Sequence, residues 1–224
     1  MKLLALDAAT EACSVALSID SEIIERYEYA PRRHAELLLP MIDEVLMASD
    51  LHITQLDALA FGCGPGSFTG LRIAAGVVQG IAFAADLPVA RVSTLAAMAY
   101  TAMHEHGVSQ VAAAIDARMQ EVYWACYVAS ADDSVELYGK EQVCEPQSVM
   151  TPIVAGEWLG VGSGWSAYGD LLKQRIAVAR YWADCYPKAS AIAVLGRQLY
   201  VQKKIVTAEQ ALPVYLRDRI AQGS

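Results

Sequence analysis

The stretch of residues 62–70, with the sequence GCGPGSFTG, decides the fold because it separates a strand from a helix. Residues 56–61 before it have the continuous apolar character of a buried strand, and residues 71–85 after it have the length and composition of a helix. Free backbone N–H groups at such a corner, together with the helix dipole, favour an anion. Ser67 and Thr69 are placed either to cap the helix or to contact a phosphate.

Two known nucleotide-binding motifs are excluded for this glycine loop. No Lys follows the glycines, so it is not a Walker A loop. Gly64 and Gly66 begin a dinucleotide fingerprint, but Thr69 stands where its third glycine belongs. Two interpretations stay open: a tight corner that needs small residues, or an anion or nucleotide contact. The residues of the second interpretation are Asp7, Gly64, Gly66, Ser67, Thr69 and Gly70.

The rest of the chain indicates an α/β fold that is built twice. Three strands expected at 3–6, 12–19 and 22–29 form an antiparallel meander, followed by helices and further strands. A second strand ending in Asp-Ala at 116–117 restarts the pattern, with a later strand, glycine turn and helix. This order predicts mixed sheets with helices against them. We expect an N-terminal lobe at 1–106 and a C-terminal lobe at 107–224. The remaining expected strands are 88–92, 111–115, 121–128, 135–138 and 158–161, and the remaining helices are 34–49, 95–104, 165–172 and 189–202.

Two expected helices of the first half are more apolar than one core-facing stripe requires. The helix at 71–85 is apolar nearly all round, which predicts burial on most sides. Its Gly76 and Gly80 share one face, where small residues let another helix approach closely. The helix at 34–49 is similarly apolar. It is either deeply covered in a monomer or offers one side to a partner. Its apolar residues are Leu37, Leu38, Leu39, Met41, Ile42, Val45, Leu46 and Met47.

The composition favours a protein partner over a nucleic acid. Of 224 residues, 55% are hydrophobic and 19% charged, which is apolar for a soluble monomer. The formal net charge of −8 argues against direct nucleic-acid binding, since phosphate contacts need Lys and Arg. We expect no signal peptide, and the longest apolar stretch, 73–85, is too short to span a bilayer. We therefore expect a cytoplasmic protein without a membrane role.

The polar residues form no recognisable catalytic or metal-binding set. The five cysteines lack a CxxC spacing and are expected to be buried free thiols. His104 and His106 point to different faces of a helix, so a solvated helix end is favoured over a metal site. Asp7 and Asp116 each end a strand, where an Asp holds Mg²⁺ or forms a hairpin turn; the turn is favoured. Arg118 and Glu121 are expected to form a local ion pair.

Four segments resemble those of the TsaB (YeaZ) family. They are LALDAAT at 4–10, GPGSFTGLR at 64–72, DARMQEVY at 116–123 and PVYLR at 213–217. The resemblance implies an actin/Hsp70/sugar-kinase-like fold of two ribonuclease-H-like lobes. It also implies a role in the threonylcarbamoyl modification of the adenosine next to the tRNA anticodon, with TsaD as direct partner and the ATPase TsaE joining the complex. In the family the first two helices contact TsaD. The corresponding residues here are Leu37, Leu38, Met41, Ile42, Val45, Arg72, Gly76 and Gly80.

The same resemblance implies a chain without catalytic residues, metal or cofactor. TsaD-like proteins carry a metal-binding His-x-x-x-His after their glycine loop, and residues 92–98 here read VSTLAAM. The expected function is that of a scaffold for TsaD, with ATP and Mg²⁺ on partner subunits, and of a homodimer when TsaD is absent. The alternative is a stand-alone Mg-nucleotide ATPase or kinase of the same fold. A metallopeptidase is the third interpretation, which the missing histidines oppose.

Overall fold

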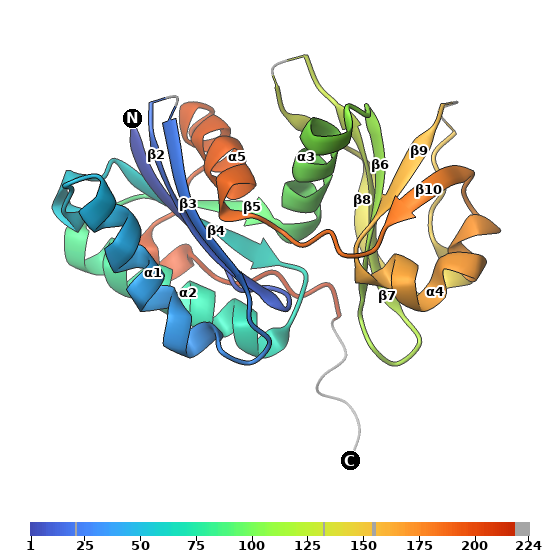
Figure 1. Ribbon diagram of the computed structural model, residues 1–224, viewed down its shortest axis with the longest axis horizontal. Helices are drawn as coiled ribbons and strands as arrows, with labels where there is room; N and C mark the ends of the chain where they lie inside the picture. The colour runs from blue at the N-terminus through green and yellow to red at the C-terminus, as the bar shows by residue number, and fades with distance from the viewer. Residues whose placement is uncertain (21, 132, 154–155, 218–224) are drawn as a thin grey trace. The chain divides into compact units, whose positions relative to one another are not determined.

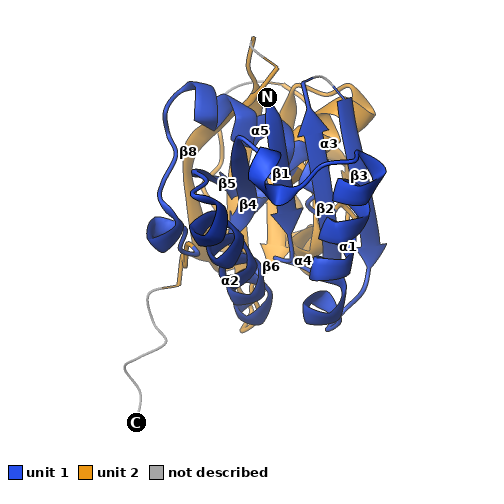
Figure 2. Ribbon diagram, turned by 90° about the vertical axis from the view of Figure 1, so that its left-hand side faces the viewer, with its two compact units in different colours: residues 1–97, 186–213 blue, residues 98–185, 214–224 orange. Residues whose placement is uncertain are grey.

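The computed structural model describes residues 1–20, 22–131, 133–153 and 156–217. The chain divides into two compact units, which Figure 2 distinguishes by colour. Unit 1 holds the described residues of 1–97 and 186–213, and unit 2 holds those of 98–185 and 214–217.

Unit 1 is built on a five-stranded mixed sheet in the order β3-β2-β1-β4-β5. The first three strands form the expected antiparallel meander, and β4 and β5 continue the sheet in parallel with β1. The strands β1, β2 and β4 are buried almost throughout because helices cover both faces. The strands are β1 (Lys2–Asp7), β2 (Ala12–Ile19), β3 (Glu22–Tyr29), β4 (Ala58–Gly64) and β5 (Val89–Ser93).

Three helices cover this sheet, two on one face and one on the other (Figure 1). Helices α1 (His34–Ala48) and α2 (Phe68–Ala85) lie side by side on the first face. Helix α5 (Ala189–Val201) covers the second face, where Gly196 brings it close to Ala60 and Ala90. The backbone N–H of Ala189 donates to the hydroxyl of Ser14 at 2.9 Å, which fixes the start of α5 on β2.

Unit 2 repeats this plan. Its sheet has the order β8-β7-β6-β9-β10, with an antiparallel meander β6-β7-β8 and with β9 and β10 parallel to β6. Its core gathers Trp124, Trp158 and Trp165, and the indole N–H of Trp165 donates to the carbonyl of Ala112 at 2.8 Å. The repeat confirms the expected fold class. The elements are α3 (Thr94–His106), β6 (Gln110–Asp116), β7 (Val122–Ala129), β8 (Val135–Cys144), β9 (Trp158–Val161), α4 (Ser163–Lys173) and β10 (Val178–Trp182).

The units do not follow the expected lobe boundary between residues 106 and 107. Helix α5 lies in unit 1, although it follows the strands of unit 2 in sequence, and most of α3 lies in unit 2. The reason is that each sheet has a second apolar face that needs a cover, and α5 supplies it for the first sheet. Strand β10 was not expected either. Strand β10 completes the repeat, because β5 occupies the same place in the first sheet.

Candidate partner interface and glycine loop

Helix α1 uses most of its apolar residues inside unit 1. Leu38, Met41, Ile42 and Val45 have exposed fractions of 7% or less, because they pack towards the sheet and α2. Leu37 is half-buried. The expectation that these four buried side chains meet a partner is therefore corrected: they belong to the core of the unit.

The outward side of α1 carries different apolar side chains. Leu39 is 54% exposed and Met47 80% exposed. They alternate along the helix with the exposed acidic residues Glu36 and Asp43, at the spacing of one helical stripe. A partner on this side therefore meets a mixed apolar and acidic surface.

Helix α2 is buried on one side only, contrary to the expectation of burial on most sides. Its outward stripe consists of Arg72, Gly76, Gly80 and Phe83, all exposed. A Cβ added at either glycine would meet nothing within 4 Å, and Phe83 is 75% exposed. Together with Leu39 and Met47, these four residues define a surface that we name the α1–α2 face.

The guanidinium group of Arg72 lies over the ring of Phe68 at 3.8 Å from the ring centroid. This cation–π contact holds Arg72 along the first turn of α2. Phe68 itself is 43% exposed. The stacked pair therefore extends the α1–α2 face with an aromatic ring and a positive charge.

Helix α2 is also long and apolar enough, by length and composition alone, to cross a membrane, with a third of it buried inside the protein. The sequence expectation that this stretch is too short was made on 73–85, whereas the helix has 18 residues. Its buried side packs on β4, and the Gln79 amide donates to the Ala211 carbonyl at 3.3 Å. Such packing is typical of a layer helix of a globular unit.

The glycine loop is a closely packed corner. A Cβ at Gly66 would lie 2.2 Å from the carbonyl oxygen of Ala9, and one at Gly70 would lie 1.8 Å from that of Ala8. The backbone N–H of Ser67 donates to the Ala9 carbonyl at 2.7 Å. The loop therefore needs small residues because it packs directly on the backbone after β1.

The other residues expected at an anion site contribute to this corner or point away from it. The hydroxyl of Ser67 accepts from the N–H of Gly70 at 3.3 Å, so it caps α2. Gly64 is buried and has a φ of 118°, which favours glycine. Thr69 is exposed on the first turn of α2. These observations favour the corner over the nucleotide contact.

Asp7 ends β1 and is fully buried. One carboxyl oxygen accepts from the N–H of Ala9 at 2.9 Å. The other has no hydrogen-bond partner in the described part of the chain and faces Gly62, where a Cβ would come within 1.8 Å of it. Burial raises the pKa of the Asp7 carboxyl to about 8, against the opposing effect of the Ala9 hydrogen bond.

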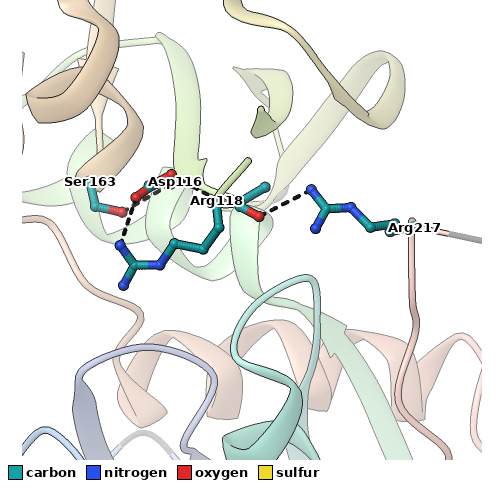
Figure 3. A network of polar contacts seen from close by, with 5 residues as sticks. Asp116, Arg118, Ser163 and Arg217 are labelled. Atoms are coloured by element: carbon teal, nitrogen blue, oxygen red, sulfur yellow. Dashed lines mark hydrogen bonds and ion pairs between the residues drawn. The ribbon is translucent and has the colours of Figure 1, made fainter. Parts of the chain in front are cut away.

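The second Asp of the repeat, Asp116, forms a tight turn. Its carboxylate accepts from the backbone N–H of Arg118 at 2.9 Å and pairs with the Arg118 guanidinium at 3.1 Å, while its own N–H donates to the Ser163 hydroxyl at 3.1 Å (Figure 3). The hairpin interpretation of Asp116 is therefore confirmed. The expected ion pair between Arg118 and Glu121 is wrong, since Glu121 pairs with Arg217 of the C-terminal tail.

This turn holds three consecutive residues, Arg118, Met119 and Gln120, in left-handed backbone conformation, with φ between 54° and 63°. Such conformations are unfavourable for residues with a Cβ. Arg217 holds the turn from outside: it donates to the Ala117 carbonyl at 3.1 Å and pairs with Glu121.

The cysteines and histidines serve structural roles. All five cysteines are free thiols and four are buried, as expected. Burial raises the pKa of the Cys13 and Cys126 thiols to about 12. His104 contacts the Asp133 carboxylate and the Tyr100 carbonyl, so the helix end is less solvated than expected. Across residues 1–217, apart from the four undescribed positions, no group of three or more His, Cys, Asp or Glu side chains is placed to hold a metal.

Two mixed five-stranded sheets of the same topology, each with helices, define the class of actin-like proteins built from two ribonuclease-H-like lobes. A family model described as TsaD, tRNA N6-adenosine threonylcarbamoyltransferase, matches residues 20–223. The solved structure of YeaZ from Pseudomonas aeruginosa superposes with a TM-score of 0.91 at 47% identity, over 96% of this chain and 99% of that one.

Two relatives align with this chain over almost their full lengths. The tRNA threonylcarbamoyladenosine biosynthesis protein TsaB of Escherichia coli K12 is 44% identical over 99% of this chain and 96% of its own. The TsaB protein of Haemophilus influenzae is 42% identical over 98% of this chain and 95% of its own. The chain belongs to the TsaB (YeaZ) family, which gives it a role in tRNA threonylcarbamoyladenosine biosynthesis.

Proposed function

We propose that this chain is a non-catalytic scaffold subunit in the cytoplasm, which binds TsaD and supports it in the threonylcarbamoyl modification of the adenosine next to the tRNA anticodon. The observation that carries the proposal is the α1–α2 face, an exposed apolar surface with two unobstructed glycines. The relatives named as tRNA threonylcarbamoyladenosine biosynthesis proteins support a partner from the same pathway.

The glycines of α2 support a helix as the occupant of this face. Each glycine in a helix interior costs roughly 0.5–1 kcal/mol relative to Ala. Nothing inside unit 1 needs that cost at Gly76 or Gly80, because no atom lies within 4 Å of the added Cβ. Packing of a partner helix against this stripe would explain both glycines, since a missing side chain lets two helix backbones come close.

The apolar side chains around the glycines can supply the affinity. Phe83, Met47 and Leu39 are more than half exposed, and removing such side chains from water favours association, against the cost of ordering the two partners. A stable interface needs about 800 Å² from each partner. The acidic residues Glu36 and Asp43 alternate with Leu39 and Met47 in the same stripe of α1 and favour a partner with basic residues there.

The same face can pair with a second copy of the chain when TsaD is absent. A twofold dimer of this kind uses one surface on both subunits. In this proposal TsaE joins through the complex, and ATP and Mg²⁺ are bound by the partner subunits. No direct tRNA binding by the isolated chain is expected.

A stand-alone Mg-nucleotide enzyme receives no support from the geometry of unit 1. Mg²⁺ prefers ionised carboxylates. Asp7 is fully buried, and one of its carboxyl oxygens already accepts from the Ala9 N–H. The glycine loop already packs its corner on the carbonyls of Ala8 and Ala9.

The proposal is tested by changing Phe83 to Glu and measuring TsaD binding by titration calorimetry. Val201→Glu is the matched control, because Val201 is 74% exposed and also lies near the end of a unit 1 helix. We expect Phe83→Glu to weaken TsaD binding at least about tenfold, which is roughly 1.4 kcal/mol, and Val201→Glu to leave it unchanged. Equal affinities of both variants for TsaD would contradict the proposal.

A second variant separates stability from binding. The double substitution Gly76→Ala and Gly80→Ala should stabilise the isolated chain by roughly 1–2 kcal/mol in urea unfolding, because both positions have open space. It should nevertheless weaken TsaD binding, because each methyl group moves the partner helix outward. Tighter or unchanged binding by the stabilised variant would exclude close helix packing at this face.

A further inference from the structure

An exposed basic segment lies at the β10 edge of the second sheet, in a chain whose net charge is −8. Residues 173–182 contain three cations and no acidic residue: Lys173 ends α4, Arg175 follows it, and Arg180 lies on β10. All three are exposed, as is Tyr181 beside them. We name Lys173, Arg175, Arg180 and Tyr181 the basic edge.

The cations of the basic edge are available to a ligand. Ion pairs elsewhere in the chain use Arg26, Arg33, Arg118 and Arg217. Within the described ranges, no ion pair involves Lys173, Arg175 or Arg180. Unpaired and solvated cations can contact phosphates without first breaking an internal salt bridge.

Tyr181 adds a rigid aromatic surface to these charges. Its ring stacks on Trp165 with centroids 5.8 Å apart and an interplanar angle of 21°. A Cβ added at Gly169 of the same helix would lie 3.5 Å from the ring, and the Lys173 ammonium lies 5.0 Å from the ring centroid. The ring is thus fixed on α4 while 41% of the residue stays exposed. Aromatic surfaces beside cations are typical of contacts to unpaired nucleotides.

Protection of an exposed sheet edge explains only part of this arrangement. A charged residue on an edge strand opposes pairing with another strand, which accounts for Arg180. Lys173 and Arg175 lie outside β10, so they give no such protection. The exposed Tyr181 on the same strand favours pairing with another strand and so opposes such protection. The segment as a whole therefore fits a polyanion better than a protective role.

We propose that the basic edge contacts the phosphate backbone of RNA when the chain is assembled with its partner on tRNA. The inference rests on the proposed function, which brings the chain to tRNA, and concerns unit 2, whereas the α1–α2 face belongs to unit 1. Two or three phosphate contacts are too few to hold RNA against a net charge of −8. The contribution is therefore made within the complex, where the partner supplies the main RNA affinity.

The test measures the binding of fluorescently labelled tRNA to the assembled complex with TsaD, by anisotropy at several salt concentrations. The variant carries Arg175→Gln and Arg180→Gln. The matched control carries Lys140→Gln and Lys204→Gln, which removes the same charge from exposed positions on β8 and after α5. We expect the variant to bind about five- to tenfold more weakly at 0.1 M salt, with a slope of log affinity against log salt lower by about 1–2.

A second variant tests the aromatic part of the surface. Tyr181→Ala should also weaken tRNA binding, whereas Tyr181→Phe, which keeps the stacked ring, should not. Circular dichroism establishes that each variant is folded. Equal tRNA affinity for the arginine variant and its lysine control overturns the proposal.

The assembly step distinguishes the two hypotheses. Light scattering on the mixed proteins is measured before RNA is added. Absence of a complex with the unchanged chain overturns the proposed function, and this inference with it. Normal assembly with an unchanged tRNA affinity of the arginine variant overturns the inference alone. Loss of TsaD binding by the arginine variant would show that the basic edge contacts an acidic protein surface, which also overturns it.

Discussion

Asp7 makes the stability of unit 1 depend on pH in an unusual direction. The carboxyl is fully buried, and its pKa is raised from 3.8 to about 8 chiefly by loss of solvation. In the unfolded chain the same group ionises near its ordinary value. Ionisation therefore favours the unfolded state over the whole interval between the two pKa values. The contribution of Asp7 to stability is fully present below about pH 4, falls as the pH rises, and levels off above about pH 8.

Replacing Asp7 with Asn removes this ionisation and keeps the acceptor for the Ala9 N–H. The free energy of unfolding of the unchanged chain should fall, relative to that of the variant, by about 1.4 kcal/mol per pH unit. Between pH 5 and pH 8 the difference amounts to about 4 kcal/mol.

The assay is urea unfolding of both proteins, followed by tryptophan fluorescence at pH 5, 6, 7 and 8. The quantity to compare is the difference between the two free energies, because the other ionisable groups contribute equally to both proteins. A difference that stays constant over this range would refute the reasoning, because it would mean that Asp7 is ionised in the folded chain.

Two further substitutions test the glycine loop and the tail. Gly70→Ala should destabilise the chain by about 1–3 kcal/mol in urea unfolding, since its Cβ would lie 1.8 Å from the Ala8 carbonyl oxygen. The control Gly80→Ala should stabilise the chain by about 0.5–1 kcal/mol. Equal effects of the two substitutions would contradict the close packing at Gly70. Arg217→Ala removes the partner of Glu121, so amide hydrogen exchange should accelerate in the turn of residues 117–121 and stay unchanged in β1. An unchanged exchange rate in the turn would show that Arg217 does not stabilise this turn.

Most of the secondary structure, the repeat and the family could be predicted from the sequence, whereas strand β10 could not. Alternating and continuous apolar runs identified the strands, and the glycine corner at 62–70 identified the strand-to-helix step, because these signals are local. The repeat of a strand ending in Asp-Ala predicted two sheets of one plan. The segments GPGSFTGLR and DARMQEVY carried the family resemblance without any tertiary information.

The exposed side of the two partner helices could not be obtained in this way. Because α1 and α2 are apolar on more than one side, periodicity does not select the stripe that faces the sheet. Only the packing on β2 and β4 shows that Leu38 and Val45 are core residues while Met47 and Phe83 are exposed. The glycine spacing did select the outward stripe of α2, because Gly76 and Gly80 lie on its exposed side.

The tertiary structure also decided the limits of the units and the state of Asp7. Helix α5 returns to the first sheet from the far end of the chain, and no local signal reports a contact between residues that distant in sequence. Whether a carboxyl is charged depends on the solvent that its neighbours exclude. For Asp7 one such neighbour is Gly62 of β4, which only folding brings beside β1.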